Sequence, residues 1–327
     1  MLPFTYSRAS SADDAIAAVQ KQQGAKFLGG GTNLVDLMKM GVEQPSALVE
    51  ITRLPFADIE ERAGGVRIGA MARNSAVANH PLIRERYPVL AQALLSGASP
   101  QIRNAATVGG NLLQRTRCFY FYDPSYRECN KRVPGSGCAA IQGYNRIHAV
   151  LGASDHCVAT HPSDMAVGLT ALDAKISVRG PQGERTIPFA EFYRLPGDTP
   201  HLETDLKAGE MITAIDLPAA APGRSQYLKV RDRNSYAFAL VSAAAVLNVD
   251  ADRRILDARI ALGGVAPKPW RIPAAEQALR GKPATDSTFS EAAEILVQGA
   301  KALRYNGFKV ELARRTTVRA LSSAAAG

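Results

Sequence analysis

Four cysteines share one short window of the chain, and overall composition does not explain this clustering. The window spans 40 residues, and the intervals between the cysteines are 11, 9 and 19 residues. No pair has the Cys-x-x-Cys spacing of zinc ribbons and thioredoxin-like motifs. Four thiolates from one segment suit a [4Fe–4S] cluster, whereas two disulfides, a zinc ion or unliganded thiols are the alternatives. The four positions are Cys118, Cys129, Cys138 and Cys157.

A run of three glycines, Gly29-Gly30-Gly31-Thr32-Asn33, separates a short apolar strand from a helical pattern. Glycine allows a backbone to approach a phosphate closely and to adopt positive φ, and free N–H groups of such loops bind anions. An ordinary tight turn is the alternative. Leu34 stands where the G-x-G-x-x-G motif requires glycine, and no G-K-[ST] occurs. The loop therefore suggests a phosphate site outside the Rossmann and P-loop folds.

A second glycine turn, Ala106–Asn111, offers the same chemistry. Two turns of this kind could bracket a pyrophosphate, which favours a dinucleotide over a mononucleotide. Further on, Asp164 could accept a hydrogen bond from a ribose hydroxyl and Ser163 could donate one to a phosphate. An N-terminal helix cap is the alternative for this Ser-Asp pair.

The remaining polar residues show no arrangement for acid–base or nucleophilic catalysis. Four histidines have no partner at a catalytic spacing, and we interpret them as surface or structural residues. They are His80, His148, His161 and His201. No Ser/His/Asp set or Cys/His dyad is visible. A protein that carries a redox cofactor needs none, because the cofactor supplies the chemistry.

These residues lie in a chain whose patterns predict an α+β fold. Strand, glycine turn and helix alternate near the N-terminus, as expected where turns bind ligands. Residues 114–160 hold all four cysteines and show no sustained periodicity, which is typical of a segment ordered by a ligand or a function. A small, proline-punctuated segment near residues 218–223 predicts a domain boundary.

Composition excludes several classes of protein. Of 327 residues, 46% are hydrophobic and 21% are charged, as in soluble globular proteins. The net charge of +9 comes from scattered Lys and Arg residues, without the basic run of a nucleic-acid-binding patch. The longest apolar run, Ala237–Leu247, is too short to span a membrane and is interpreted as a buried core element. No secretory signal is visible at the start.

Taken together, the motifs resemble the FAD-binding (medium) subunits of molybdenum hydroxylases, the xanthine dehydrogenase and carbon monoxide dehydrogenase group. Five segments carry the resemblance in order: Lys26–Lys39, Arg103–Asn111, His161–Ala166, Phe192–Pro218 and Gly263–Arg271. In most members the second glycine turn runs almost directly into the Pro-x-Ser-Asp segment. The insertion of about 45 residues here is similar to that of two branches, the periplasmic aldehyde oxidoreductase and 4-hydroxybenzoyl-CoA reductase, both of which carry a [4Fe–4S] cluster.

The resemblance implies a two-part FAD-binding domain of the vanillyl-alcohol-oxidase (PCMH) type over residues 1–220, with a [4Fe–4S]-binding insertion at about 114–160. A smaller α+β C-terminal domain would cover residues 223–323. The four cysteines would be the cluster ligands. The residues expected to bind FAD are Phe27, Leu28, Gly29, Gly30, Gly31, Thr32, Asn33, Leu34, Thr107, Gly110, Asn111, Asp164, Ile212 and Lys229.

The same resemblance implies a function in a complex. The chain would pass electrons from aldehyde oxidation through FAD to an external acceptor. Its partners would be a small subunit with two [2Fe–2S] clusters and a large subunit with the molybdenum cofactor. We expect export to the periplasm through a partner's signal, with the cytoplasm as the alternative. The alternative functions are a 4-hydroxybenzoyl-CoA reductase subunit and a non-redox binding module with disulfides or zinc.

Overall fold

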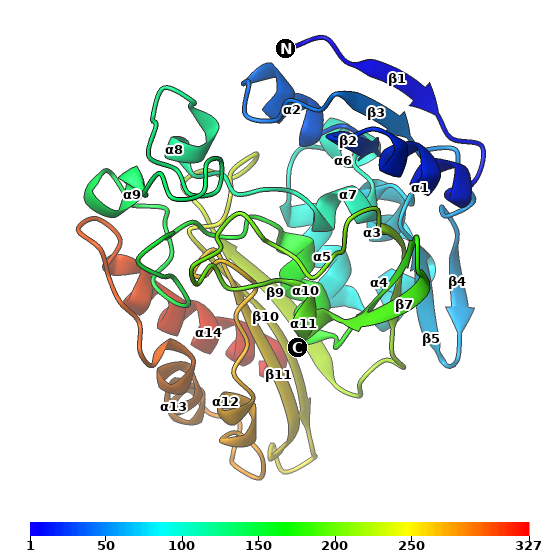
Figure 1. Cartoon of the computed structure of the whole chain (residues 1–327). Coiled ribbons are helices and arrows are strands. Elements are labelled where there is room, and N and C mark those ends of the chain that lie inside the picture. Colours follow the sequence, from blue (N-terminus) through cyan, green and yellow to red (C-terminus); the bar gives the residue numbers. More distant parts are fainter. Residues whose placement is uncertain (327) are drawn as a thin grey trace.

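The computed structural model describes residues 1–326, which form three β-sheets with helices packed around them (Figure 1). The N-terminal sheet has three parallel strands in the order β1–β3–β2. Its elements are β1 (Thr5–Arg8), α1 (Ala12–Lys21), β2 (Ala25–Leu28), α2 (Leu34–Lys39) and β3 (Ala47–Glu50). Helix α1 begins where Ser11 accepts a hydrogen bond from the N–H of Asp14, and serine is one of the residues most favoured at this capping position.

The central sheet has five antiparallel strands in the order β4–β5–β8–β6–β7. These strands are β4 (Ile59–Arg62), β5 (Gly65–Gly69), β6 (Lys175–Gly180), β7 (Gly183–Pro188) and β8 (Met211–Leu217). The helices of this part are α3 (Asn74–Asn79), α4 (Pro81–Arg86), α5 (Pro88–Ser96), α6 (Pro100–Ala105), α7 (Val108–Leu112), α10 (Asp164–Ala171) and α11 (Phe189–Phe192).

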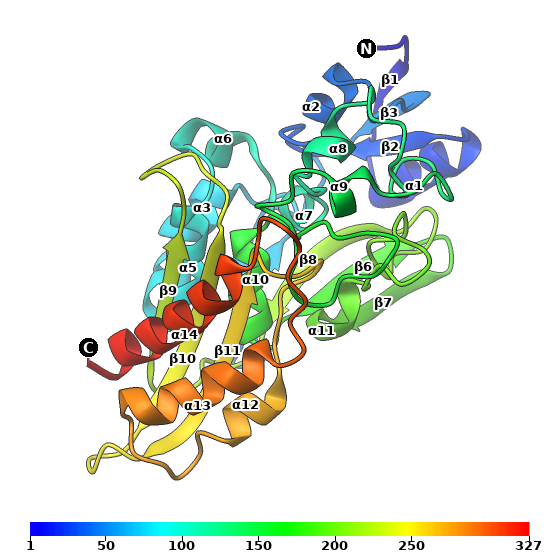
Figure 2. The ribbon, with the colours of Figure 1, turned by 90° about the vertical axis from the view of Figure 1, so that its left-hand side faces the viewer.

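A C-terminal sheet of three antiparallel strands follows, in the order β9–β10–β11. Its elements are β9 (Arg224–Val230), β10 (Val241–Val249), β11 (Ile255–Gly263), α12 (Pro273–Gln277), α13 (Asp286–Val297) and α14 (Phe308–Ala326). Figure 2 shows α14 lying across this sheet, with α13 beside it.

Strand β10 is buried on both faces. Alternate residues enter different cores: Ala244 and Val246 pack with the central part of the chain, whereas Ala243 and Ala245 pack with the C-terminal helices. Helices α5 and α10 contact this sheet, and helix α14 contacts it too. Because neither face meets water, the strand is almost continuously apolar, which confirms that Ala237–Leu247 contains a core element.

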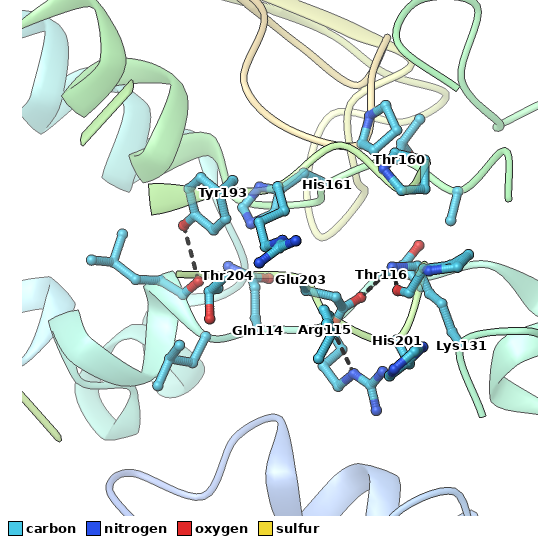
Figure 3. A pocket seen from close by; sticks show the side chains of 18 of the residues that line it. Gln114, Arg115, Thr116, Lys131, Thr160, His161, Tyr193, His201, Glu203 and Thr204 are labelled. Atoms are coloured by element: carbon cyan, nitrogen blue, oxygen red, sulfur yellow. Dashed lines mark hydrogen bonds and ion pairs between the residues drawn. The ribbon is translucent and has the colours of Figure 1, made fainter. Parts of the chain in front are cut away.

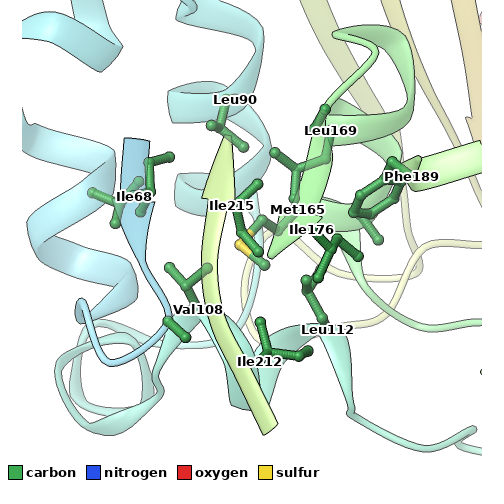
Figure 4. Packing of buried hydrophobic residues seen from close by; sticks show 14 of the residues in the cluster. Ile68, Leu90, Val108, Leu112, Met165, Leu169, Ile176, Phe189, Ile212 and Ile215 are labelled. Carbon is green, nitrogen blue, oxygen red and sulfur yellow. The ribbon is translucent and has the colours of Figure 1, made fainter. Parts of the chain in front are cut away.

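The main core lies between the central sheet and its helices (Figure 4). Helix α7, which is only five residues long, is held there because Val108 and Leu112 are buried against residues such as Ile212 and Ile215. The second glycine turn is therefore the start of a short helix rather than a free turn.

Residues 114–160 contain only two one-turn helices, α8 (Phe119–Tyr122) and α9 (Ala139–Gln142), and the rest is irregular, as predicted. We call this segment the insertion. Two isolated antiparallel β-bridges occur in it, one between the backbones of Cys129 and Cys138 and one between those of Ser154 and Cys157. Within residues 1–326, no helix combines the length and the apolar character needed to cross a membrane.

Candidate functional site

The first glycine loop connects β2 to α2, and its conformation requires glycine at two positions for different reasons. Gly31 has φ of +71°, in the left-handed region that favours glycine. At Gly30 a Cβ would lie 2.0 Å from the carbonyl oxygen of Ala105, so no side chain fits. Within residues 1–326, the N–H groups of Gly30, Gly31 and Thr32 have no hydrogen-bond partner, and they can bind an anion.

The second glycine turn meets the first at Thr107. The Thr107 hydroxyl caps α7 by accepting a hydrogen bond from the N–H of Gly110, 3.2 Å away. A Cβ at either Gly29 or Gly110 would lie 2.9 Å from the same hydroxyl oxygen. The two turns, about 75 residues apart in the sequence, therefore pack together as closely as their glycines allow.

A cavity of about 490 Å³ opens beside the two turns. Most of the predicted FAD-binding residues line it: the whole of Phe27–Leu34, together with Thr107, Gly110 and Ile212. Lys26, Arg115 and Lys207 also line it and supply cationic side chains. Two closely packed glycine turns, free N–H donors and nearby cations suit a pyrophosphate, so these residues fit FAD.

The other three predicted residues lie outside this cavity. Asn111 accepts a hydrogen bond from the Ser163 hydroxyl at 2.6 Å, and Ser163 caps α10 by accepting one from the N–H of Ala166. Ser163 is therefore a helix cap, the alternative stated for it. Asp164 and Lys229 form a buried ion pair, with Lys229 Nζ 2.7 Å from Asp164 Oδ2.

Tyr227 completes this buried group. Its hydroxyl donates to Asp164 Oδ1 at 2.6 Å, and burial together with the charge of Asp164 raises the pKa of Tyr227 well above its usual value. Asp164 also lines a second cavity, of about 320 Å³, whose walls include Arg117 and Phe119 of the insertion. The predicted flavin residues thus divide into those that line the cavity beside the glycine turns and three that lie outside it, of which only Asp164 lines the second cavity.

All four cysteines are free thiols, so the disulfide alternative is not present in this structure. Three are buried and Cys138 is half-buried, and all four belong to one small apolar core inside the insertion. Leu37 of α2 packs into the same core. One helix therefore connects the first glycine loop, at its start, with the cysteine core.

Burial raises the pKa of Cys118 to about 12 and that of Cys157 to about 11, which keeps both thiols protonated at neutral pH. Hydrogen bonds from backbone N–H groups oppose this effect: Phe121 and Tyr120 donate to Cys118, and Ala159 donates to Cys157. Such donors stabilise a thiolate, the form that binds metal, and binding would release the protons.

The structure also bears on the kind of metal that these thiols suit. Within residues 1–326, no three Cys, His, Asp or Glu side chains converge closely enough to bind one metal ion. The cysteines nevertheless share one core and affect one another's pKa values electrostatically. The four thiols belong to one core, and backbone N–H groups donate to the sulfurs of Cys118, Cys138 and Cys157, a donor set compatible with a multi-iron cluster.

His148 lies beside the cysteines, and its position in the sequence did not predict this contact. Its Nε2 lies 3.1 Å from Cys118 Sγ, and the side chain is almost completely buried. Burial lowers the pKa of His148 to about 4, so the imidazole is neutral. An interval of 30 residues gives no periodic signal, and only the irregular path of the insertion brings the two together.

A chain of charges ties the insertion to the rest of the domain (Figure 3). Arg115 bridges two carboxylates, with distances of 2.6 Å to Glu43 and 2.8 Å to Glu203. Lys131 reaches Glu203 at 2.6 Å, and Lys26 pairs with Glu43. Burial raises the pKa of each Glu, but the neighbouring cations outweigh it, so both pKa values are lowered. Sequence patterns gave no sign of these long-range pairs.

Polar contacts join the insertion directly to the first glycine loop. Asn33 accepts a hydrogen bond from the N–H of Arg115 at 3.0 Å and donates to the Tyr122 hydroxyl at 3.3 Å. Arg117 pairs with Asp36 of α2 at 3.1 Å. The loop that is predicted to bind phosphate and the segment that holds the cysteines therefore form one continuous structure.

Comparison with known proteins agrees with this geometry. Residues 2–220 match the family described as "FAD binding domain in molybdopterin dehydrogenase", and residues 226–324 match "CO dehydrogenase flavoprotein C-terminal domain". The chain belongs to the FAD-binding medium subunits of the molybdenum hydroxylase family. This confirms the resemblance and the α+β fold class, and it makes the chain an oxidoreductase subunit with an FAD-binding domain.

Individual relatives cover the whole chain. The aldehyde oxidoreductase FAD-binding subunit PaoB of Escherichia coli is 50% identical over 100% of this chain and 99% of its own length. The carbon monoxide dehydrogenase medium chain of Hydrogenophaga pseudoflava is 28% identical over 99% and 98%. A solved structure of carbon monoxide dehydrogenase from that organism superimposes with a TM-score of 0.77 at 28% identity, covering 100% of this chain and 99% of the matched chain.

Proposed function

We propose that this chain is the FAD- and [4Fe–4S]-carrying electron-transfer subunit of a heterotrimeric, molybdenum-containing aldehyde oxidoreductase. The observation that carries the cluster is the gathering of four free thiols in one core of the insertion. The full-length 50% identity to an aldehyde oxidoreductase subunit supports the aldehyde as the source of electrons. No residue for hydroxylating an aldehyde is assigned to this chain.

The residues of this chain bind and orient the flavin. The free N–H groups of Gly30, Gly31 and Thr32 would hold the pyrophosphate, with Lys207 supplying positive charge from the cavity wall. Lys26 and Arg115 also line this cavity, but both are paired with Glu43. Asp164, held in place by Lys229 and Tyr227, would present its carboxylate to the rest of the cofactor at the neighbouring cavity. Bound FAD supplies the ability to collect two electrons and pass them to an acceptor.

The cysteines would hold the cluster in a largely dry setting. Thiolate ligation, burial and hydrogen bonds to sulfur are the protein features that set a cluster's reduction potential. Here the backbone donors at Cys118, Cys138 and Cys157 supply such hydrogen bonds. When bound, the cluster supplies one-electron chemistry.

The partners in this proposal are a small subunit with two [2Fe–2S] clusters and a large subunit with the molybdenum cofactor. Relatives named as medium chains support an assembly of several subunits. We further propose that the complex reaches the periplasm through a signal on a partner, with an external acceptor oxidising the flavin there.

The decisive experiment is iron, acid-labile sulfide and flavin analysis of the complex purified from its native operon. We expect four irons in this subunit for each FAD, measured after the subunits are separated without oxygen. Zinc without iron, or thiols that remain unliganded in freshly purified protein, would remove the cluster from the proposal. The co-purified large subunit then distinguishes an aldehyde oxidoreductase from a 4-hydroxybenzoyl-CoA reductase by the substrate that reduces the complex.

A further inference from the structure

His148 occupies an unusual position for a histidine outside an acid–base site. Its side chain is almost completely buried, and its Nε2 lies 3.1 Å from Cys118 Sγ. The other ring nitrogen, Nδ1, has no hydrogen-bond partner within residues 1–326. The sulfur is therefore the only polar partner that the described surroundings offer to the imidazole nitrogens.

The backbone of His148 is held by the C-terminal part of the chain. Asn306 Nδ2 donates to the His148 carbonyl at 3.3 Å and to the Ala149 carbonyl at 3.1 Å. Lys309 Nζ donates to the same His148 carbonyl at 2.8 Å. Asn306 and Lys309 are both fully buried, so this clamp is rigid and dry. The imidazole is therefore aimed at Cys118 by residues about 160 positions further along the chain.

A thiolate bound to iron has no proton to donate, so it can only accept a hydrogen bond. In the loaded protein the contact must therefore run from Nε2–H to the sulfur, which selects the Nε2–H tautomer. Such a bond stabilises the state with more negative charge on the cluster and its ligands, and this is the reduced state. Hydrogen bonds to sulfur are one of the main controls of cluster potential.

We propose that His148 is a positioning residue that orients the Cys118 thiolate and raises the reduction potential of the cluster through an Nε2–H···S hydrogen bond. This inference rests on the proposed cluster. In this proposal Asn306 and Lys309 of the C-terminal domain influence the reduction potential of the cluster, because they hold His148, although all the cluster ligands come from the insertion.

The test is an EPR-monitored redox titration of the cluster in the intact complex, comparing His148→Gln with His148→Met. Glutamine keeps an N–H donor at similar reach, whereas methionine fills similar space and donates nothing. We expect the methionine variant to shift the reduction equilibrium about tenfold towards the oxidised cluster, which is about 59 mV for one electron. Glutamine should restore most of the wild-type potential. His201→Met, at an exposed histidine, is the matched control and should leave the potential unchanged.

The outcomes separate this inference from the proposed function. Wild-type protein without iron would overturn the cluster itself. Wild-type iron content with the same potential in both His148 variants would overturn only the hydrogen bond. If methionine abolishes the cluster while glutamine retains it at the wild-type potential, the donor role is supported. Loss of iron in both variants would overturn it in favour of simple packing by the ring.

Discussion

The two regions of this chain that are predicted to bind ligands are built in opposite ways. The first glycine loop lies between a strand and a helix, and its shape is determined by backbone geometry: positive φ at Gly31 and the contact of Gly30 with Ala105. The insertion has only two one-turn helices and is held by side chains, through its small core, its hydrogen bonds and the charged chain around Arg115.

Because of this difference, we expect the two regions to respond differently to substitutions and to loss of a bound ligand. A loop positioned by flanking elements loses its ligand when its backbone changes, while the surrounding domain remains folded. A segment without regular structure depends on each contact and on its ligand for order. The insertion should therefore unfold locally when the proposed cluster is lost, whereas loss of FAD should leave the sheet and helices around the glycine loop intact.

The largest effect is expected from Cys138→Ser. Serine removes one thiolate, so the cluster should be lost or strongly depleted and residues 114–160 should become cleavable by protease. FAD should be retained, because the glycine turns do not use this side chain. Iron and flavin content together with limited proteolysis measure the change, and Val133→Ala, at an exposed insertion residue, is the control. Full iron content would contradict the ligand assignment.

Gly30→Val tests the other region. The new Cβ would lie 2.0 Å from the Ala105 carbonyl oxygen, so the loop must move away from the second turn and FAD should be expelled. Iron content should stay close to that of the wild type. Flavin absorbance of the purified complex measures the loss. Gly307→Ala, where a Cβ meets only an ordinary contact at 3.7 Å, should bind FAD normally. Full flavin occupancy in Gly30→Val would show that the loop assignment is wrong.

Arg115→Met should weaken the connection between the two regions. It leaves Glu43 with Lys26 and Glu203 with Lys131, so each carboxylate keeps one partner. We expect a loss of about 2 kcal/mol in the free energy of unfolding, between the values of exposed and fully buried pairs. Denaturant unfolding measures it, with Arg315→Met in an exposed helix pair as a control near zero. Equal effects of the two variants would mean that the buried network contributes no more than a surface pair.

The smallest effect should come from pH. Glu43 and Glu203 have pKa values below the ordinary 4.5, so their contribution to stability is complete above pH 4.5 and is lost as pH falls through their folded pKa values. Because Gln mimics a protonated carboxyl group, Glu203→Gln should be less stable than the wild type at neutral pH. This difference in thermal midpoint should shrink below pH 4.5. A difference that is independent of pH would contradict the role of the Glu203 charge.

Short-range features of this protein could be predicted from the sequence. The Ser11 cap, the strand–loop–helix around Gly29–Asn33 and the irregular insertion depend on residues close together in the chain, and local hydrogen bonding decides them. The second glycine turn shows the limit of such reasoning. Thr107 begins a helix instead of a free turn, because burial of Val108 and Leu112 stabilises it. The predicted domain boundaries and individual ligand contacts remain predictions.

The sequence by itself predicted which residues would carry a dinucleotide and a cluster, because the conformational freedom of glycine and the thiol of cysteine are properties that other residues lack. Only the tertiary structure decided how they are coupled: Asp164 to Lys229, Arg115 to Glu203 and His148 to Cys118. These partners are between 30 and 88 residues apart. Contacts over such intervals have no sequence period, since they form only when packing of the whole chain brings the side chains together.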